Sequence, residues 1–128
     1  MTDFKSPYAA TLGLRRDGAR VTMPFADGLT GRPGFLHGGA ISGLLENTAW
    51  VTLLDALSED ALSEDAKIKP VTVTVDFLRG GAPVETHAEA QIVRLGRRIA
   101  NVLVTAWQED RAKPIATANL KMMIDRQA

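Results

Sequence analysis

Two side chains that can exchange a proton lie within an otherwise neutral and largely apolar part of the chain. Between Leu36 and Leu54, only His37 and Glu46 can titrate. A carboxylate in the middle of a buried apolar helix is costly unless it is paired or used. Glu46 is therefore a candidate general base or nucleophile. The alternative is that Glu46 lies on a solvent-facing stripe of the helix and takes no part in chemistry.

Gly38 and Gly39 stand where this helix should begin. The first backbone N–H groups of a helix have no partners within the helix and lie at the positive end of its dipole. Glycines allow a ligand to approach these groups, so a developing oxyanion could be held there. The alternative is a glycine turn that only leads the chain into the helix.

The spacing of these residues limits how they can act together. Gly38 and Glu46 are eight positions apart, which is about 12 Å along a helix at roughly 1.5 Å per residue. If both act on one carbonyl carbon, they must come from different subunits. A two-fold axis that places antiparallel helices side by side would meet this requirement. The catalytic hypothesis thus includes a homodimer.

The pattern along the chain predicts the elements that position these residues. Residues 1–8 are expected to form a poorly ordered leader, and residues 9–26 a hairpin that turns at Asp17-Gly18. Apolar residues at three- and four-residue spacing predict one long helix that includes residues 40–57. An acidic repeat, ALSED, occupies 56–60 and 61–65 and is expected to form the helix end and a connection. Two-residue alternation in VTVTVDFL, with Val71, Val73, Val75 and Phe77 on one face, opens four further strands; these cover 71–78, 86–95, 99–108 and 115–124.

This order of elements predicts an α+β fold. About six antiparallel strands would wrap around one long central helix, in a single domain that spans residues 1–128. Fifteen basic and fifteen acidic residues give no net charge, which argues against a nucleic-acid partner. With no cysteine and two histidines, thiolate chemistry is excluded and a metal site is not expected. The N-terminus resembles no signal peptide, and the longest apolar stretch, 41–54, is short for a membrane span. We therefore expect a soluble, cytoplasmic protein with no membrane partner.

The segment PGFLHGGAISGLLENTAW (33–50) resembles the signature of hotdog-fold thioesterases of the PaaI-like (phenylacetate-pathway) group. In that signature a glycine, here Gly34, is followed by His-Gly-Gly and by an acid nine positions after the histidine. VTVTVDFLRGGAP (71–83) and LGRRIANVLVTAW (95–107) are similar to later strands of the family. The resemblance covers most of residues 30–125. It implies the hotdog fold, a sheet wrapped around one helix, with assembly into homodimers and into homotetramers as dimers of dimers.

The resemblance also implies an activity and a set of roles. The protein would be an acyl-CoA thioesterase that hydrolyses an aryl- or medium-chain acyl thioester, with coenzyme A as part of the substrate and no cofactor. Glu46 would be the base or nucleophile. The partner subunit's Gly38 amide, aided by Gly39, would polarise the carbonyl, and His37 would brace the loop.

Substrate contacts are expected from residues around this motif. Arginine suits the phosphates of coenzyme A, although strand-end arginines can also be simply solvated. The aromatic residues could line an acyl pocket or pack in the core. The family often has Asn or Gln six positions before the histidine, where this chain has Gly31. Either another group, such as Asn47 or Thr48, substitutes for that amide or catalysis is weaker. The full set of substrate-binding candidates is Gly34, Phe35, Asn47, Trp50, Arg79, Arg97 and Arg98.

Two other functions compete with hydrolysis. A hydratase or dehydratase on the same fold would need a histidine near the acid, whereas His37 precedes the helix. A non-catalytic acyl-CoA binding or sensor protein is suggested by Gly31 and by Trp50, which takes a position where the family sometimes has a polar residue.

Overall fold

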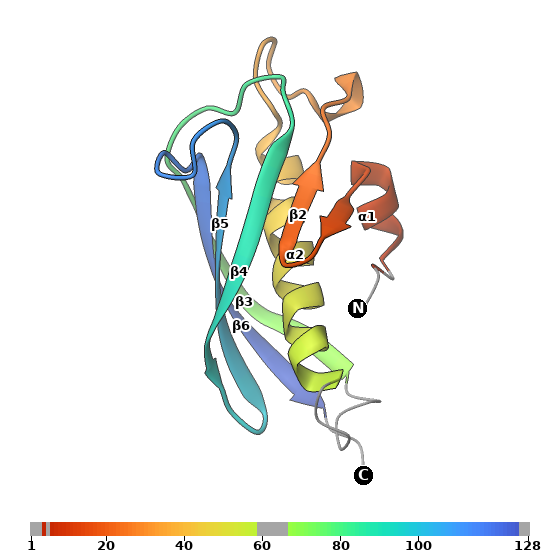
Figure 1. The fold of residues 1–128 in the computed structure, drawn as a ribbon, viewed down its shortest axis with the longest axis vertical. Helices are drawn as coiled ribbons and strands as arrows, with labels where there is room; N and C mark the ends of the chain where they lie inside the picture. The colour runs from red at the N-terminus through yellow and green to blue at the C-terminus, as the bar shows by residue number, and fades with distance from the viewer. Residues whose placement is uncertain (1–3, 5, 59–66, 126–128) are drawn as a thin grey trace.

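The computed structural model describes residues 4, 6–58 and 67–125. These residues form two α-helices, a short 3-10 helix and six strands. Their bounds are α1 Pro7–Leu12, β1 Arg15–Asp17, β2 Arg20–Met23, η1 Asp27–Leu29, α2 Gly38–Ser58, β3 Lys67–Phe77, β4 Thr86–Leu95, β5 Ile99–Trp107 and β6 Ala116–Asp125. All the strands belong to one antiparallel sheet with the order β1-β2-β4-β5-β6-β3. The sheet curves around α2 (Figure 1), which confirms the predicted α+β architecture.

Helix α2 is buried on most of its sides, as its composition predicts. Leu44, Leu45 and Leu53 are fully buried. A half-buried stripe runs along the remaining side at four-residue spacing, through Ser42, Glu46, Trp50 and Leu54. Residues four apart lie on the same face of a helix. Glu46 therefore lies on the open stripe of a core helix and not in the core itself.

Strands β5 and β6 contribute most of the buried residues of the sheet. Their inward-facing residues alternate with outward-facing ones, as in a sheet with one buried face. The buried residues that alternate in this way are Ala100, Val102, Val104, Ala106, Ala116, Ala118, Leu120, Met122 and Ile124. Strand β3 pairs with β6 at one edge and has no strand partner on its other side among the described residues.

Strand β3 differs from the predicted pattern at one position. Val73, Val75 and Phe77 pair with inward-facing residues of β6 and share one face. Val71 does not share this face regularly, because the register shifts between Pro70 and Thr72 and leaves Val71 as the extra residue of a bulge. The strand also begins earlier than predicted, at Lys67.

The N-terminal region contains a helix that the strand pattern did not predict. The hairpin at Asp17-Gly18 is present, with Gly18 at a φ of 61°, but it begins only at Arg15. Before it lies α1, which is capped by the Ser6 side chain, has Pro7 in its first turn and ends at Gly13 with a φ of 70°. These are standard start and stop signals of a helix. Parts of the predicted leader and of the ALSED repeat (59–65) lie outside the described residues.

Helix α1 packs on α2 at Gly43. A Cβ atom at Gly43 would lie 2.6 Å from Cε2 of Tyr8 and 2.8 Å from Cδ1 of Leu12. The lack of a side chain at Gly43 thus allows the two helices to meet. In the described part of the chain, neither helix combines the length and the apolar character that a membrane crossing requires.

Candidate active site

The start of α2 is organised by His37, which occupies the position just before the first helical residue. Its Nδ1 atom accepts a hydrogen bond from the Gly39 N–H at 2.8 Å. Its carbonyl oxygen accepts from the N–H groups of Ala40 and Ile41 at 3.0 and 3.2 Å. His37 is therefore an N-cap that uses an imidazole nitrogen where Ser, Thr, Asp or Asn is more usual. Its Nδ1 must be unprotonated to accept this bond.

This cap engages the backbone N–H of Gly39 but not that of Gly38. Among the described residues, the Gly38 N–H has no hydrogen-bond acceptor. A Cβ atom at Gly39 would lie 2.8 Å from the Nδ1 of His37, so the capping imidazole and any side chain at residue 39 would collide. Gly39 was expected to help polarise a substrate carbonyl, but its N–H is already engaged. The unpaired donor at the positive end of α2 is that of Gly38.

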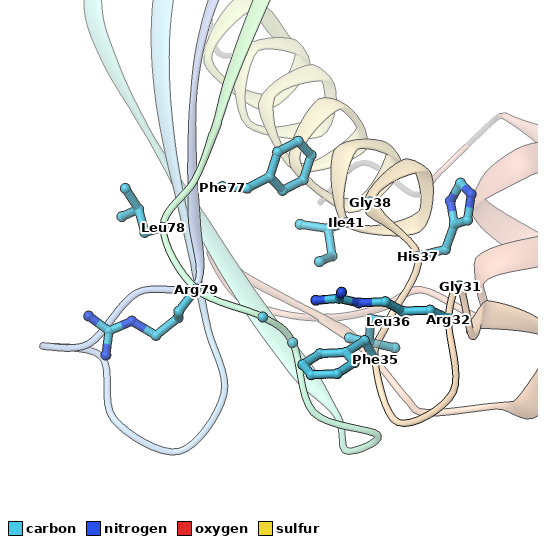
Figure 2. Close-up of a pocket in the computed structure, with 12 residues that line it drawn as sticks. Gly31, Arg32, Phe35, Leu36, His37, Gly38, Ile41, Phe77, Leu78 and Arg79 are labelled. Carbon is cyan, nitrogen blue, oxygen red and sulfur yellow. The ribbon is translucent and has the colours of Figure 1, made fainter.

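A cavity of about 550 Å³ opens beside this donor. It lies between the loop before α2 and the end of β3 (Figure 2), and Gly38 forms part of its wall. The Phe77 ring packs against Gly38, since a Cβ atom there would lie 3.3 Å from the Cζ of Phe77. Leu36, Ile41 and Leu78 add apolar surface. None of the twelve lining residues is acidic.

Two arginines line the same cavity. The guanidinium carbon of Arg32 lies 4.4 Å from the centroid of the Phe35 ring, which is a cation–π contact. Figure 2 shows the Arg32 side chain extending into the cavity, toward Ile41, whereas Arg79 points away from it. Arg79 was a sequence candidate for substrate binding. Arg32 was not, because nothing in the spacing of GRPG indicates which way its side chain points.

Glu46 lies outside the lining of this cavity. It is half-buried on the open stripe of α2, two helical turns beyond Gly38. Among the described residues it has neither a hydrogen-bond nor an ion-pair partner. Within one protomer, the free amide and the carboxylate therefore do not face a common cavity. Trp50 follows Glu46 on the same stripe and packs partly against the core.

Asn47 and Thr48, the candidates to substitute for an amide side chain at residue 31, are both hydrogen-bonded within α2. Asn47 is buried, and its Nδ2 donates to the Gly43 carbonyl oxygen at 2.8 Å. Thr48 is fully buried, and its Oγ1 donates to the Leu44 carbonyl oxygen at 2.7 Å. Both side chains are bonded to their own helix and lie away from the cavity.

The other predicted contacts fall in different places. Phe35 lines the cavity. Gly34 makes the turn of the loop before α2, with a φ of 85°, but is not among the lining residues. Arg97 and Arg98 lie in the turn between β4 and β5, at the opposite end of the sheet from the start of α2 (Figure 1). In one protomer, therefore, neither of these two arginines is near Gly38.

Comparison with known proteins decides the family. The model of the acyl-CoA thioesterase N-terminal domain matches residues 28–123. The chain belongs to this acyl-CoA thioesterase family. The match includes the His-Gly-Gly segment, the cavity and Glu46, and it identifies the protein as a thioester hydrolase. A search of curated proteins found no match to this thioesterase.

Solved structures share the hotdog fold of this thioesterase. A thioesterase family protein from Silicibacter pomeroyi is 26% identical, with a TM-score of 0.81 over 96% of this chain and 92% of that one. A putative thioesterase from Ralstonia eutropha, related to phenylacetic acid degradation, is 23% identical, with a TM-score of 0.79 over 94% and 92% of the two chains. The BH2602 protein from Bacillus halodurans, solved with CoA, is 16% identical, with a TM-score of 0.82 over 95% and 78%.

Proposed function

We propose that this thioesterase hydrolyses aryl- or medium-chain acyl-CoA at a site shared by two protomers. The Gly38 N–H of one protomer polarises the thioester carbonyl, and Glu46 of the other activates the attack on it. The observation that carries the proposal is the unpaired Gly38 N–H at the positive end of α2, in the wall of a cavity that has no acidic residue. Such a donor stabilises the negative charge that develops on a carbonyl oxygen.

The carboxylate must come from outside the protomer that supplies Gly38. The cavity lining contains no acid of its own, and Glu46 is about 12 Å further along the same helix at roughly 1.5 Å per residue. Strand β3 offers a way to bring a second protomer close, because it is an eleven-residue edge strand. Its inward-facing Val73 and Phe77 are 41% and 55% exposed. Unpaired edges of this kind readily pair with another chain.

The reaction needs only water and the thioester. In the general-base route, Glu46 takes a proton from water while the water oxygen bonds to the carbonyl carbon and the carbonyl oxygen becomes an oxyanion at the Gly38 N–H. Collapse of this intermediate breaks the carbon–sulfur bond. The thiolate then takes up a proton, and the acyl group leaves as a carboxylate. In the alternative route, a Glu46 oxygen bonds to the carbonyl carbon first, and the carbon–sulfur bond breaks so that the thiolate leaves and takes up a proton. Water then hydrolyses the resulting anhydride, which releases the acyl carboxylate and restores Glu46.

The cavity supports the substrate class. Its volume of about 550 Å³ lies within the range of small-molecule sites, about 300–1,000 Å³. Phe77, Ile41 and Leu78 provide an apolar wall for a ring or a hydrocarbon chain. Arg79 follows β3 at the rim and suits a phosphate of coenzyme A. The Bacillus halodurans neighbour, which binds CoA, is consistent with this carrier.

Thiol release tests the proposal. Wild type, Glu46→Gln and Glu46→Ala are incubated with a panel of aryl- and medium-chain acyl-CoAs. We expect release by wild type and a loss of at least about 100-fold in both variants, by analogy with other acid–base groups. Glu109→Gln removes an exposed carboxylate in the turn after β5 and is the matched control.

Unchanged turnover in Glu46→Gln would remove Glu46 from the mechanism. Binding without release by wild type would favour the sensor, and hydration of an enoyl-CoA would favour the hydratase.

A further inference from the structure

Arg32 is exposed, and no acid among the described residues neutralises its positive charge. Among the described residues, its guanidinium has no salt-bridge partner and no hydrogen-bond partner. The guanidinium makes a cation–π contact with the Phe35 ring. By contrast, Arg15, Arg16, Arg20 and Arg111 each lie within salt-bridge distance of a carboxylate.

The Arg32 side chain brings this charge into the cavity that the free amide also lines. Arg32 and Gly38 line the same cavity, with no acid among the lining residues. The positive end of α2 adds to the potential there. The cation–π contact with Phe35 also limits where the guanidinium can go. Since no described residue that lines the cavity balances this charge, the cavity suits an anionic group on the ligand.

Thioester hydrolysis produces such a charge. The acyl group enters neutral, carries an oxyanion in the transition state and leaves as a carboxylate. A donor that binds the anionic forms more strongly than the neutral one lowers the barrier, because only differential binding accelerates the step. Gly38 provides one N–H, whereas a tetrahedral oxyanion can accept more than one hydrogen bond.

We propose that Arg32 is a catalytic residue that donates a hydrogen bond to the substrate carbonyl oxygen as it becomes an oxyanion, and then to the product carboxylate. This inference rests on the proposed function for the reaction at Gly38, but not on the role of Glu46. Arg79 has a different task. It points away from the cavity, and we place it on the phosphates of the carrier.

The first test separates these two arginines. Arg32→Met, Arg32→Lys and Arg79→Met are assayed with one acyl group on coenzyme A and on N-acetylcysteamine, which lacks phosphates. For Arg32→Met we expect kcat to fall about tenfold on both carriers with little change in KM, which is less than the roughly 100-fold loss typical of removing an oxyanion donor. Arg32→Lys keeps the positive charge, so its kcat should lie between those of wild type and Arg32→Met. Millimolar guanidinium should restore part of the Arg32→Met rate. Arg79→Met should raise KM for the coenzyme A thioester alone.

The second test does not require turnover. Titration calorimetry measures binding of the free acyl carboxylate and of its primary amide to Glu46→Gln and to Glu46→Gln/Arg32→Met. We expect the Kd of the carboxylate to rise about tenfold when Arg32 is removed, while the Kd of the neutral amide stays the same. An unchanged carboxylate Kd, or a kinetic effect limited to KM on coenzyme A, would overturn the assignment. Wild-type turnover in Glu46→Gln would instead overturn the shared site and leave the Arg32 result standing.

Discussion

The Nδ1 atom of His37 accepts a hydrogen bond from the Gly39 N–H at 2.8 Å. This one bond determines which amide at the start of α2 is left for a ligand. With Gly39 engaged, and with Ala40 and Ile41 bonded to the His37 carbonyl oxygen, the free donor is that of Gly38. The residue triplet His-Gly-Gly thus combines a cap, a free donor and a position where a side chain would collide with the cap.

Removing the imidazole should weaken the start of the helix. His37→Ala is expected to lower the free energy of unfolding by about 1 kcal/mol, the usual cost of losing an N-cap. His37→Asn supplies another acceptor at the same position and should recover most of this loss. Urea unfolding followed by circular dichroism measures both. Equal stability of wild type and His37→Ala would show that the cap contributes nothing.

The two glycines should respond differently to a methyl group. In Gly39→Ala the new Cβ would lie 2.8 Å from the His37 Nδ1, so the cap must open and stability should fall by about 1 kcal/mol. In Gly38→Ala the Cβ would lie 3.3 Å from the Phe77 ring, which can shift slightly, so stability should change little. Thermal unfolding compares the two variants. A larger loss in Gly38→Ala than in Gly39→Ala would contradict this account of the helix start.

The contact between α1 and α2 should make Gly43 sensitive to substitution. Gly43→Ala gains about 1 kcal/mol in helix propensity, but its Cβ would lie 2.6 Å from Tyr8, and overpacking costs about 1–3 kcal/mol. We expect a net loss that is smaller when Tyr8→Ala is also present. A double-mutant cycle should then give a coupling of at least about 0.5 kcal/mol. Additive effects would mean that α1 does not pack on Gly43 in solution.

Much of the fold could be predicted because apolar residues repeat every three to four positions in the helix and every two positions in the strands. Strand β4 occupies the predicted 86–95, and α2 extends the predicted helix by only a few residues. Helix α1 was missed because its apolar pattern is too short to show a period. Its caps, Ser6-Pro7 and Gly13, were the available signal. The bulge at Val71 has no such signal, because it depends on pairing with β6.

The candidate site was less predictable than the fold. Motif spacing indicated His37, Gly38 and Glu46, but it did not show that Gly39 is occupied by His37. Nor did it show that Asn47 and Thr48 bond to their own helix. Arg32 could not be found from the sequence, since its relevance comes from where its side chain points and from the lack of acids around it. These features depend on tertiary packing, which spacing along the chain does not record.

Subunit complementation tests the shared site most directly. Gly38→Pro removes the free N–H at a helix position where proline is well tolerated, and Glu46→Ala removes the carboxylate; each should be inactive alone. When the two are refolded together in equal amounts, half of the dimers are mixed and each mixed dimer has one intact site. We therefore expect about a quarter of wild-type thiol release. Mixed dimers that form but release no more thiol than the separate variants would contradict a site built from the amide of one protomer and the carboxylate of the other.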